Sequence, residues 1–419
     1  MDTSDFFIED GIKIYKEEET FYNPAMKFNR DISLLTIKNY FKEHTEVRIL
    51  TAMCASGLRG MRYLKEDKKN IVHFNDISEN AINSLKKNLT LNGFLTSKVY
   101  LAIERNILKN EKLIITQKDC NVLMNELYRF YDVIDIDPFG SCNTFAENAF
   151  RSIKHNGIIC FTCTDKAALC SKVEKCYTKY GSHIYKNFCK NETPIRVLLS
   201  FLSHTAARFD FSIEPLLSFS VDYYLRVIVR VKLGKGKDVI ENTSHTLICK
   251  CGNFMQQSIR KKPENIICNT CQNPMNLYGP FWIKPYCDRK FIKQMLENLD
   301  DRNARLKGVL KYLEQEIDSP WYFESNKIAK YLKTTTLNRK QIFANLEKRG
   351  FLFSLTHCDV NGFKTNAPLS VIFEIFKNSD HCEVSSTVET LLKDNFYKGL
   401  LSSGMKPGSL PKQKEPNKR

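Results

Sequence analysis

The stretch VRILTAMCASGLRG, Val47–Gly60, joins a short β-rich run to a helical segment through a turn of small residues. Val47–Leu50 is expected to form a buried strand, and the following helix is expected to cover Gly60–Glu66. Gly57 can adopt a positive φ, which lets the backbone of the turn come close to a ligand. The turn lacks the G-x-G-x-x-G pattern and no Walker lysine follows, so a phosphate-binding loop is disfavoured.

The alternation of strand and helix continues along the chain. Further strands are expected at Ile71–Asn75, Tyr131–Ile136, Gly157–Cys163 and Tyr223–Lys232, and a helix at Glu79–Asn92 with Ile82, Leu85 and Leu89 on one face. Strands separated by helices predict an α/β fold with a mostly parallel, doubly wound sheet. Ligands of such sheets bind beyond the carboxyl ends of the strands.

The charge of the chain is strongly basic. Its 63 Lys and Arg residues exceed its 47 Asp and Glu residues, giving a net charge of +16 and a pI near 9.1. This excess favours a polyanionic partner, most often nucleic acid, although charge also serves solubility alone. No apolar run approaches the roughly 20 residues of a membrane span. Seven acidic residues among the first thirty argue against a secretory signal or a transit peptide, so a soluble intracellular protein is expected.

Fifteen cysteines fall into two groups. Most are scattered through apolar surroundings and are expected to be reduced core thiols: Cys54, Cys120, Cys160, Cys163 and Cys170.

The second group has metal-ligand spacing. Cys249-x-Cys251 and Cys268-x-x-Cys271 suit a closed, structural zinc site with four thiolates. The first pair is one residue shorter than the usual C-x-x-C, so four reduced cysteines are the alternative, and Cys287 is a substitute ligand.

Acidic residues follow the predicted strands. Asp76 ends the second strand, where an acid commonly accepts hydrogen bonds from ribose hydroxyls. The alternative is a helix N-cap formed by Asp76 or Ser78. Asp119 precedes another helix, where it could meet an adenine amino group or equally cap that helix.

The stretch VIDIDPFGSC, Val133–Cys142, carries a carboxylate out of a hydrophobic strand. Asp137 could hydrogen-bond an exocyclic amine and stabilise the positive charge that develops on its nitrogen during methyl transfer. Pro138 fixes the chain, and Phe139 can stack on a flat base. The alternative is an ordinary Asp-Pro turn after a strand.

This stretch resembles the Asp-Pro-Phe-Gly-Ser-Pro signature of the tRNA guanine-26 N2-dimethyltransferases, which are class I S-adenosylmethionine enzymes. Five other segments, in order and spread over both halves of the chain, are similar to segments of that family: FYNPAMKFNRDIS (Phe21–Ser33), ASGLRGMR (Ala55–Arg62), CFTCTD (Cys160–Asp165), GPFWIKPYCD (Gly279–Asp288) and THCDVNGFKTNAP (Thr356–Pro368). The chain departs from the family pattern at Thr51, Met26 and Cys142; Thr51 puts a methionine contact at that position in doubt.

The resemblance implies a Rossmann-like class I methyltransferase fold and a donor site. Arg30 and Arg59 would meet the methionine carboxylate of S-adenosylmethionine, Asp76 its ribose, and Asp119 with the Cys120 backbone its adenine. The expected reaction transfers methyl groups to N2 of guanine 26 in tRNA, giving N2,N2-dimethylguanosine.

Guanine N2 is a poor nucleophile, so catalysis should be mostly alignment, with Asp137 sharing or taking the proton. The base must leave its stack to reach the donor, and Phe139 would receive it. Adenine N6 methylation is the rival reaction. A zinc-containing RNA-binding protein without catalysis is the rival from another class.

The expected organisation has three parts. Residues 1–236 form the methyltransferase domain, residues 237–401 a carboxy-terminal α+β, tRNA-binding domain with the zinc site, and residues 402–419 a disordered basic tail. Gly234–Asn242 resembles a linker, Asp288–Glu316 is helical, and Trp321–Lys377 suggests a winged-helix-like unit. A monomer is expected, in the nucleus first and the mitochondrion second.

Overall fold

The computed structural model describes residues 5–16, 21–94, 99–100, 111–234, 236–262, 266–299, 303–378 and 382–393. The basic tail expected at 402–419 lies outside the described residues.

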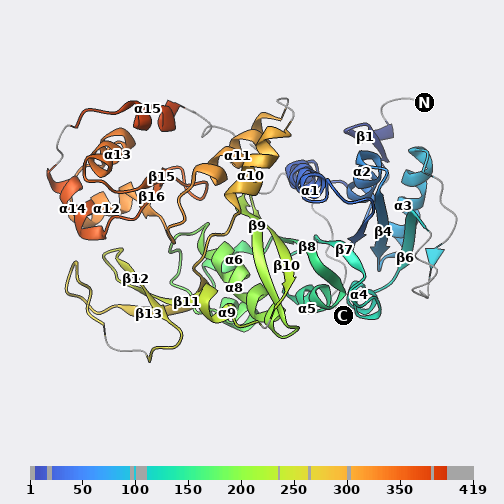
Figure 1. The fold of residues 1–419 in the computed structure, drawn as a ribbon, viewed down its shortest axis with the longest axis horizontal. Helices are drawn as coiled ribbons and strands as arrows, with labels where there is room; N and C mark the ends of the chain where they lie inside the picture. The colour runs from blue at the N-terminus through green and yellow to red at the C-terminus, as the bar shows by residue number, and fades with distance from the viewer. Residues whose placement is uncertain are drawn as a thin grey trace.

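An eight-stranded sheet forms the centre of the fold (Figure 1). Its strands lie in the order β5 (Val99–Tyr100), β6 (Leu113–Gln117), β4 (Asn70–Asp76), β3 (Val47–Thr51), β7 (Tyr131–Ile136), β8 (Ile153–Cys163), β10 (Tyr224–Leu233) and β9 (Phe211–Val221). The first six run parallel, and β10 pairs antiparallel with both β8 and β9. The expected α/β fold with a mostly parallel sheet is confirmed.

Helices cover both faces of this sheet, as a sheet with two apolar faces requires. They are α1 (Lys27–Tyr40), α2 (Leu58–Glu66), α3 (Glu79–Leu91), α4 (Cys120–Glu126), α5 (Asn143–Ser152), α6 (Lys166–Cys170), α7 (Val173–Tyr180) and α8 (Thr193–Ala207). Helix α5 contacts α4 and α8 on one side, while α1 contacts α2 on the other. Ile82, Leu85 and Leu89 of α3 are all buried, as their spacing predicts.

A hairpin of β1 (Phe6–Glu9) and β2 (Ile12–Tyr15) precedes the short 3-10 helix η2 (Pro24–Met26) and α1. Strand β2 contacts α2 and α3. The hairpin therefore packs against the helices that follow β3 and β4, although no strand was expected there.

The carboxy-terminal region contains two small sheets and several helices (Figure 1). After α9 (Val239–Asn242), the elements are β11 (Thr243–Ile248), β12 (Phe254–Ser258), β13 (Asn276–Trp282), α10 (Arg289–Glu297), α11 (Ala304–Gln315), β14 (Phe323–Glu324), α12 (Ser325–Leu332), α13 (Arg339–Lys348), β15 (Phe353–Leu355), β16 (Gly362–Thr365), α14 (Leu369–Asn378) and α15 (Ser386–Lys393). Helices α12 and α13 followed by the β15–β16 hairpin match the arrangement of a winged helix.

The hydrophobic core of the central sheet continues into this region. Trp282, Ile292, Val309 and Trp321 are almost fully buried and pack in the same cluster as the strands of the central sheet. A second cluster holds the four cysteines and most of the winged-helix-like unit.

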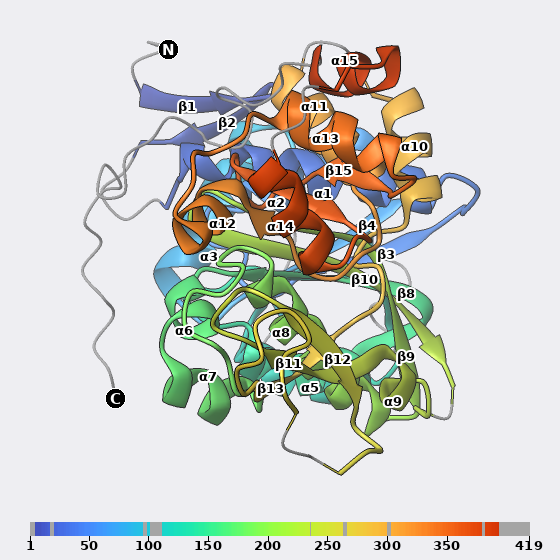
Figure 2. The ribbon, with the colours of Figure 1, turned by 90° about the vertical axis from the view of Figure 1, so that its left-hand side faces the viewer.

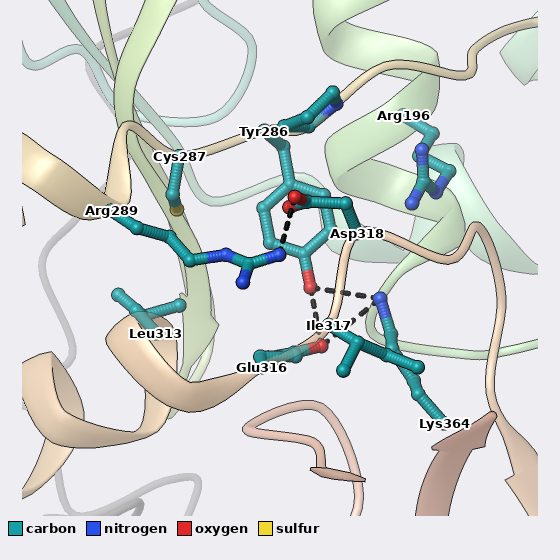
Figure 3. Close-up of a pocket in the computed structure, with 10 residues that line it drawn as sticks. Arg196, Tyr286, Cys287, Arg289, Leu313, Glu316, Ile317, Asp318 and Lys364 are labelled. Atoms are coloured by element: carbon teal, nitrogen blue, oxygen red, sulfur yellow. Dashed lines mark hydrogen bonds and ion pairs between the residues drawn. The ribbon is translucent and has the colours of Figure 1, made fainter. Parts of the chain in front are cut away.

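Buried charges also join the two regions (Figure 3). Glu316 Oε1 accepts hydrogen bonds from Tyr286 at 2.5 Å and forms an ion pair with Lys364 at 3.1 Å. Lys364 Nζ also lies 3.1 Å from Glu192, the residue before α8, and Glu192 pairs with Arg196 at 2.7 Å. Two acidic and two basic side chains thus pair with each other in a buried position. Such pairing is required because an unpaired buried charge would be strongly destabilising. We call these five residues the interdomain charge cluster.

One cysteine expectation is wrong. Cys163, expected to be a reduced thiol, forms a disulfide with Cys142, with the two Cα atoms 5.5 Å apart. The loop after β7 folds over the carboxyl end of β8, a proximity that the separation of 21 residues conceals. The cysteines at 54, 120, 160 and 170 are free and buried, as expected.

Candidate active site

Three predicted acids lie beyond the carboxyl ends of parallel strands. Asp76 ends β4, Asp119 follows β6, and Asp137 follows β7, with β3 lying between β4 and β7 in the sheet. Because the carboxyl ends of parallel strands share one edge, the fold brings all three acids to the same edge. The turn after β3 opens onto this edge as well.

The turn after β3 depends on glycine. Gly57 has φ of 82° and precedes α2, and a Cβ added to it would lie 2.2 Å from a methyl carbon of Leu85. A larger residue would therefore be strained and would clash with α3. Asp76 holds the same turn, because its Oδ2 accepts a hydrogen bond from the Ala55 N–H at 2.9 Å. Its Oδ1 accepts from the Ser78 N–H at 3.0 Å, and Ser78 itself caps α3.

Asp119 caps helix α4. Its Oδ1 accepts from the Asn121 and Val122 N–H groups at 2.8 and 3.2 Å. The cap considered from the sequence is therefore present, and the adenine contact stays a prediction. Cys120 is buried beside it, and burial together with Asp119 raises the pKa of the thiol to about 12. Little of this thiol is ionised near neutral pH, which disfavours a role as a nucleophile.

Arg59 of α2 forms ion pairs with two acids, Asp135 of β7 and Asp137, which follows β7. Its guanidinium forms ion pairs with Asp137 and with Asp135, the latter at 3.3 Å. Asp135 is fully enclosed and also binds Arg226 at 2.9 Å and the Tyr63 hydroxyl at 2.6 Å. Burial alone would lower the pKa of Arg59, but Asp135 and Asp137 raise it well above its ordinary value. The structure thus ties Arg59 to the predicted catalytic acid; its contact with the donor carboxylate stays a prediction.

Arg30 of α1 is held by the amino-terminal hairpin. Its Nε and Nη2 bind the two carboxylate oxygens of Glu9 at 2.7 and 2.5 Å, and Glu9 also accepts from Arg62 at 2.8 Å. Burial would raise the pKa of Glu9, but Arg30 and Arg62 hold it below its ordinary value. The paired guanidinium is oriented and charged, while its role toward the donor stays a prediction.

Phe139 presents an unusually exposed ring beside Asp137. Its side chain is 74% exposed, and Phe21 meets it edge-on at a centroid distance of 5.3 Å. The loop that carries Phe139 is fixed to the end of β8, since Thr164 accepts from the Gly140 N–H at 2.8 Å and donates its own N–H to the Gly140 carbonyl at 2.9 Å. An exposed ring on a fixed loop suits a flat substrate.

The four-cysteine cluster, Cys249, Cys251, Cys268 and Cys271, is brought together as predicted. Its sulfur atoms all lie within 4.8 Å of one another, with Cys249 and Cys271 at 3.3 Å and Cys251 and Cys268 at 3.7 Å. Cys287 lies elsewhere, where its sulfur contacts the backbone of Ser218.

Sequence reasoning missed several residues at this edge. Glu9 and Asp135 orient the two predicted arginines, and Ile77 and Val122 leave apolar side chains 69% and 47% exposed next to Asp76 and Asp119. An apolar residue directly after a strand-end acid, as Ile77 is after Asp76, was a usable sequence signal. No sequence signal indicated the role of Glu9, because nothing in the sequence places it near Arg30.

Among the helices of the described ranges, none combines the length and the apolar character needed to cross a bilayer.

Comparison with known proteins agrees with this architecture. The family model described as N2,N2-dimethylguanosine tRNA methyltransferase matches residues 3–377. A tRNA (guanine(26)-N(2))-dimethyltransferase of Thermococcus kodakarensis is 32% identical over 87% of this chain and 95% of its own length. A mitochondrial enzyme of the same name from Saccharomyces cerevisiae is 29% identical over 87% of this chain and 77% of its own.

A solved structure of Trm1 from Pyrococcus horikoshii in complex with S-adenosyl-L-methionine matches with a TM-score of 0.76 and 30% identity, covering 88% of this chain and 97% of that one. The range matched by the family model, residues 3–377, includes every segment that carried the resemblance. The chain therefore belongs to the N2,N2-dimethylguanosine tRNA methyltransferase family.

Proposed function

We propose that this chain transfers methyl groups from S-adenosylmethionine to N2 of guanine 26 in tRNA, giving N2,N2-dimethylguanosine. The observation that carries the proposal is the Asp137–Pro138–Phe139 loop, fixed at the carboxyl end of β7 beside Arg59, in a chain that belongs to this family. The agreement of the relatives over most of the chain supports the same activity.

The donor would occupy the edge between the turn after β3 and the acids at the ends of β4 and β6. Asp76 would accept hydrogen bonds from the ribose, and Asp119 with the Cys120 backbone would meet the adenine. Arg30 and Arg59 would face the methionine carboxylate. The exposed side chains of Ile77 and Val122 support an apolar ring bound there. When bound, the donor supplies an electrophilic methyl group on a sulfonium.

Asp137 would direct the amine that accepts the methyl group. Arg59 binds one of its oxygens, Oδ2, so Oδ1 can accept an N–H from the guanine. As the nitrogen becomes positive during attack, the carboxylate stabilises that charge and takes the released proton. The ion pair with Arg59 holds the carboxylate in place, which makes Arg59 a positioning residue. Pro138 has no N–H to compete, and Phe139 stacks on the base.

The base must leave its helix before it can reach this edge. We propose that residues 1–236 carry the chemistry and that residues 237–401 hold the body of the tRNA through phosphates and shape. We also propose a monomer. For its compartment we propose the nucleus or the mitochondrion; the yeast relative's mitochondrial label supports the second.

The four-cysteine cluster fits a structural zinc ion. Four thiolates at about 2.3 Å from a tetrahedral zinc lie roughly 3.8 Å apart, close to the spacing of the sulfur atoms here. The cluster joins the turn after β11 to the turn before β13, so zinc would fix this small sheet. Four sulfur ligands leave no open position for water, so a catalytic role is not proposed.

Mass spectrometry of nucleosides from tRNA incubated with the chain and S-adenosylmethionine tests the proposal. Appearance of N2-methylated guanosine at position 26 is expected. N6-methylated adenosine would establish the rival reaction. Donor-independent RNA binding without any methylation would establish the non-catalytic rival.

A further inference from the structure

The segment between β8 and α8 forms a surface that the catalytic and donor roles leave unexplained. Residues 166–190 contain six lysines and one glutamate, a strong local excess even in this basic chain. Seven of the exposed side chains of this segment are lysine, tyrosine or histidine, and we call them the basic-aromatic surface: Lys172, Lys175, Tyr177, His183, Tyr185, Lys186 and Lys190. Glu174 is also exposed, and it is the one acid among them.

The aromatic members of this surface are open to solvent. Tyr177 is 63% exposed and Tyr185 37%. Tyr278 of β13 lies against the rings of Tyr185 and His183, each at a centroid distance of 5.3 Å. Two backbone hydrogen bonds between His183 and Gly279 fix this loop to β13 (Figure 2). Exposed flat rings among cations are the usual platform for unstacked bases.

The surface is attached directly to the catalytic loop. The hydroxyls of Tyr180 and Ser141 lie 2.6 Å apart, and the Asn143 amide donates to the Lys179 carbonyl at 3.1 Å. Helix α7 therefore adjoins the loop that carries Phe139. An RNA strand that delivers a base to Phe139 has its flanking nucleotides beside this helix.

We propose that the basic-aromatic surface binds the tRNA strand on one side of the everted guanine, with its lysines on phosphates and Tyr177 or Tyr185 stacked on an unpaired base. The identity of the RNA rests on the proposed function. Phosphates match the lysine charges, and the exposed rings favour nucleic acid over an acidic protein segment. This contact is additional to the one proposed for residues 237–401.

A pair of matched triple variants tests the proposal. K172S/K175S/K186S removes three exposed lysines of the surface. K42S/K68S/K112S removes three exposed lysines that precede β3, β4 and β6, at the opposite edge of the sheet. Binding of labelled tRNA by fluorescence anisotropy is measured at several salt concentrations, with donor affinity by calorimetry. Tyr177→Ala is measured in the same way.

The surface variant should bind tRNA at least about tenfold more weakly than the control variant, with unchanged donor affinity. Its slope of log affinity against log salt should fall in magnitude by roughly 2–3, since each phosphate contact contributes ~0.7–0.9. Tyr177→Ala should weaken binding without changing that slope. Equal tRNA affinities of the two triple variants would overturn the proposal. Because tRNA binding requires no turnover, this comparison tests the basic-aromatic surface even if the wild-type chain methylates no guanine.

Discussion

Asp137→Asn keeps the shape of the side chain while removing its charge and its ability to take a proton. The structure limits the cost of this change to stability. Arg59 retains its ion pair with Asp135, so its guanidinium does not become an uncompensated buried charge. The Arg59 and Asp137 side chains are 11% and 23% exposed, so weakening this pair should lower the free energy of unfolding by about 1–3 kcal/mol.

The effect on catalysis should be far larger. Proton transfer by a positioned group contributes about 10²–10⁴ in rate, which corresponds to roughly 2.7–5.5 kcal/mol of activation free energy. We therefore expect kcat for methyl transfer to tRNA to fall at least about 100-fold. Donor affinity should stay within about threefold, because Asp76 and Asp119 lie at the ends of other strands and Arg59, which contacts Asp137, keeps its ion pair with Asp135.

The assay is single-turnover methyl transfer from labelled S-adenosylmethionine to tRNA, with donor affinity measured by calorimetry. Asp132→Asn is the matched control, because Asp132 lies at the opposite end of the same strand, where it pairs with Lys154 at 2.8 Å. The control should keep its rate. If Asp137→Asn transferred methyl groups within about tenfold of the wild-type rate, the role assigned to this carboxylate would be wrong.

Four further outcomes are expected. Asp76→Ala should weaken donor binding at least about tenfold, because a charge-assisted hydrogen bond is lost. The tRNA affinity of this variant, measured by fluorescence anisotropy, should stay unchanged. Lys364→Met should lower the free energy of unfolding in urea by about 3–5 kcal/mol, whereas Lys154→Met, which breaks a partly exposed pair, should cost about 1 kcal/mol or less. Burial would raise the pKa of Glu316, but Lys364 and His357 hold it below its ordinary value of 4.5. The contribution of Glu316 to stability is therefore complete above pH 4.5 and is lost as the pH falls. On acid titration, the Lys364→Met variant should lose less stability than the wild-type chain. A strong zinc chelator should lower the melting temperature and release about one zinc per chain; no change in either would exclude the metal.

Much of the catalytic half could be predicted from local pattern. Tyr131–Ile136 forms β7 with the expected bounds, because a run of apolar residues bounded by a turn leaves little choice of structure. The expected strand at Tyr223–Lys232 is β10, shifted by one residue. Its antiparallel direction could not be predicted, since the pattern of a buried strand does not depend on the direction of its neighbours.

The partners of the predicted residues were harder to predict. Arg59 was identified from its motif, but its pairing with Asp135 and Asp137 depends on the distance between α2 and β7 in the folded sheet. The pairing of Arg30 with Glu9 depends on a hairpin of two four-residue strands, which is too short for a clear periodic signal. Cysteine spacing, by contrast, predicted the four-cysteine cluster well because its four residues lie in two short turns.

The core that runs from the central sheet into Trp282 and Trp321 has a consequence for biosynthesis. Helix α8 contacts both β9 and β13, so part of its apolar surface stays uncovered until the later segment has left the ribosome. The catalytic half therefore leaves the ribosome first, but its core is complete only after the carboxy-terminal segment has been made. A nascent chain stalled before Trp321 should expose apolar surface and be bound by chaperones or degraded by proteases. The carboxy-terminal region could therefore be lost in evolution only if the apolar surface that it covers on the catalytic half were also changed.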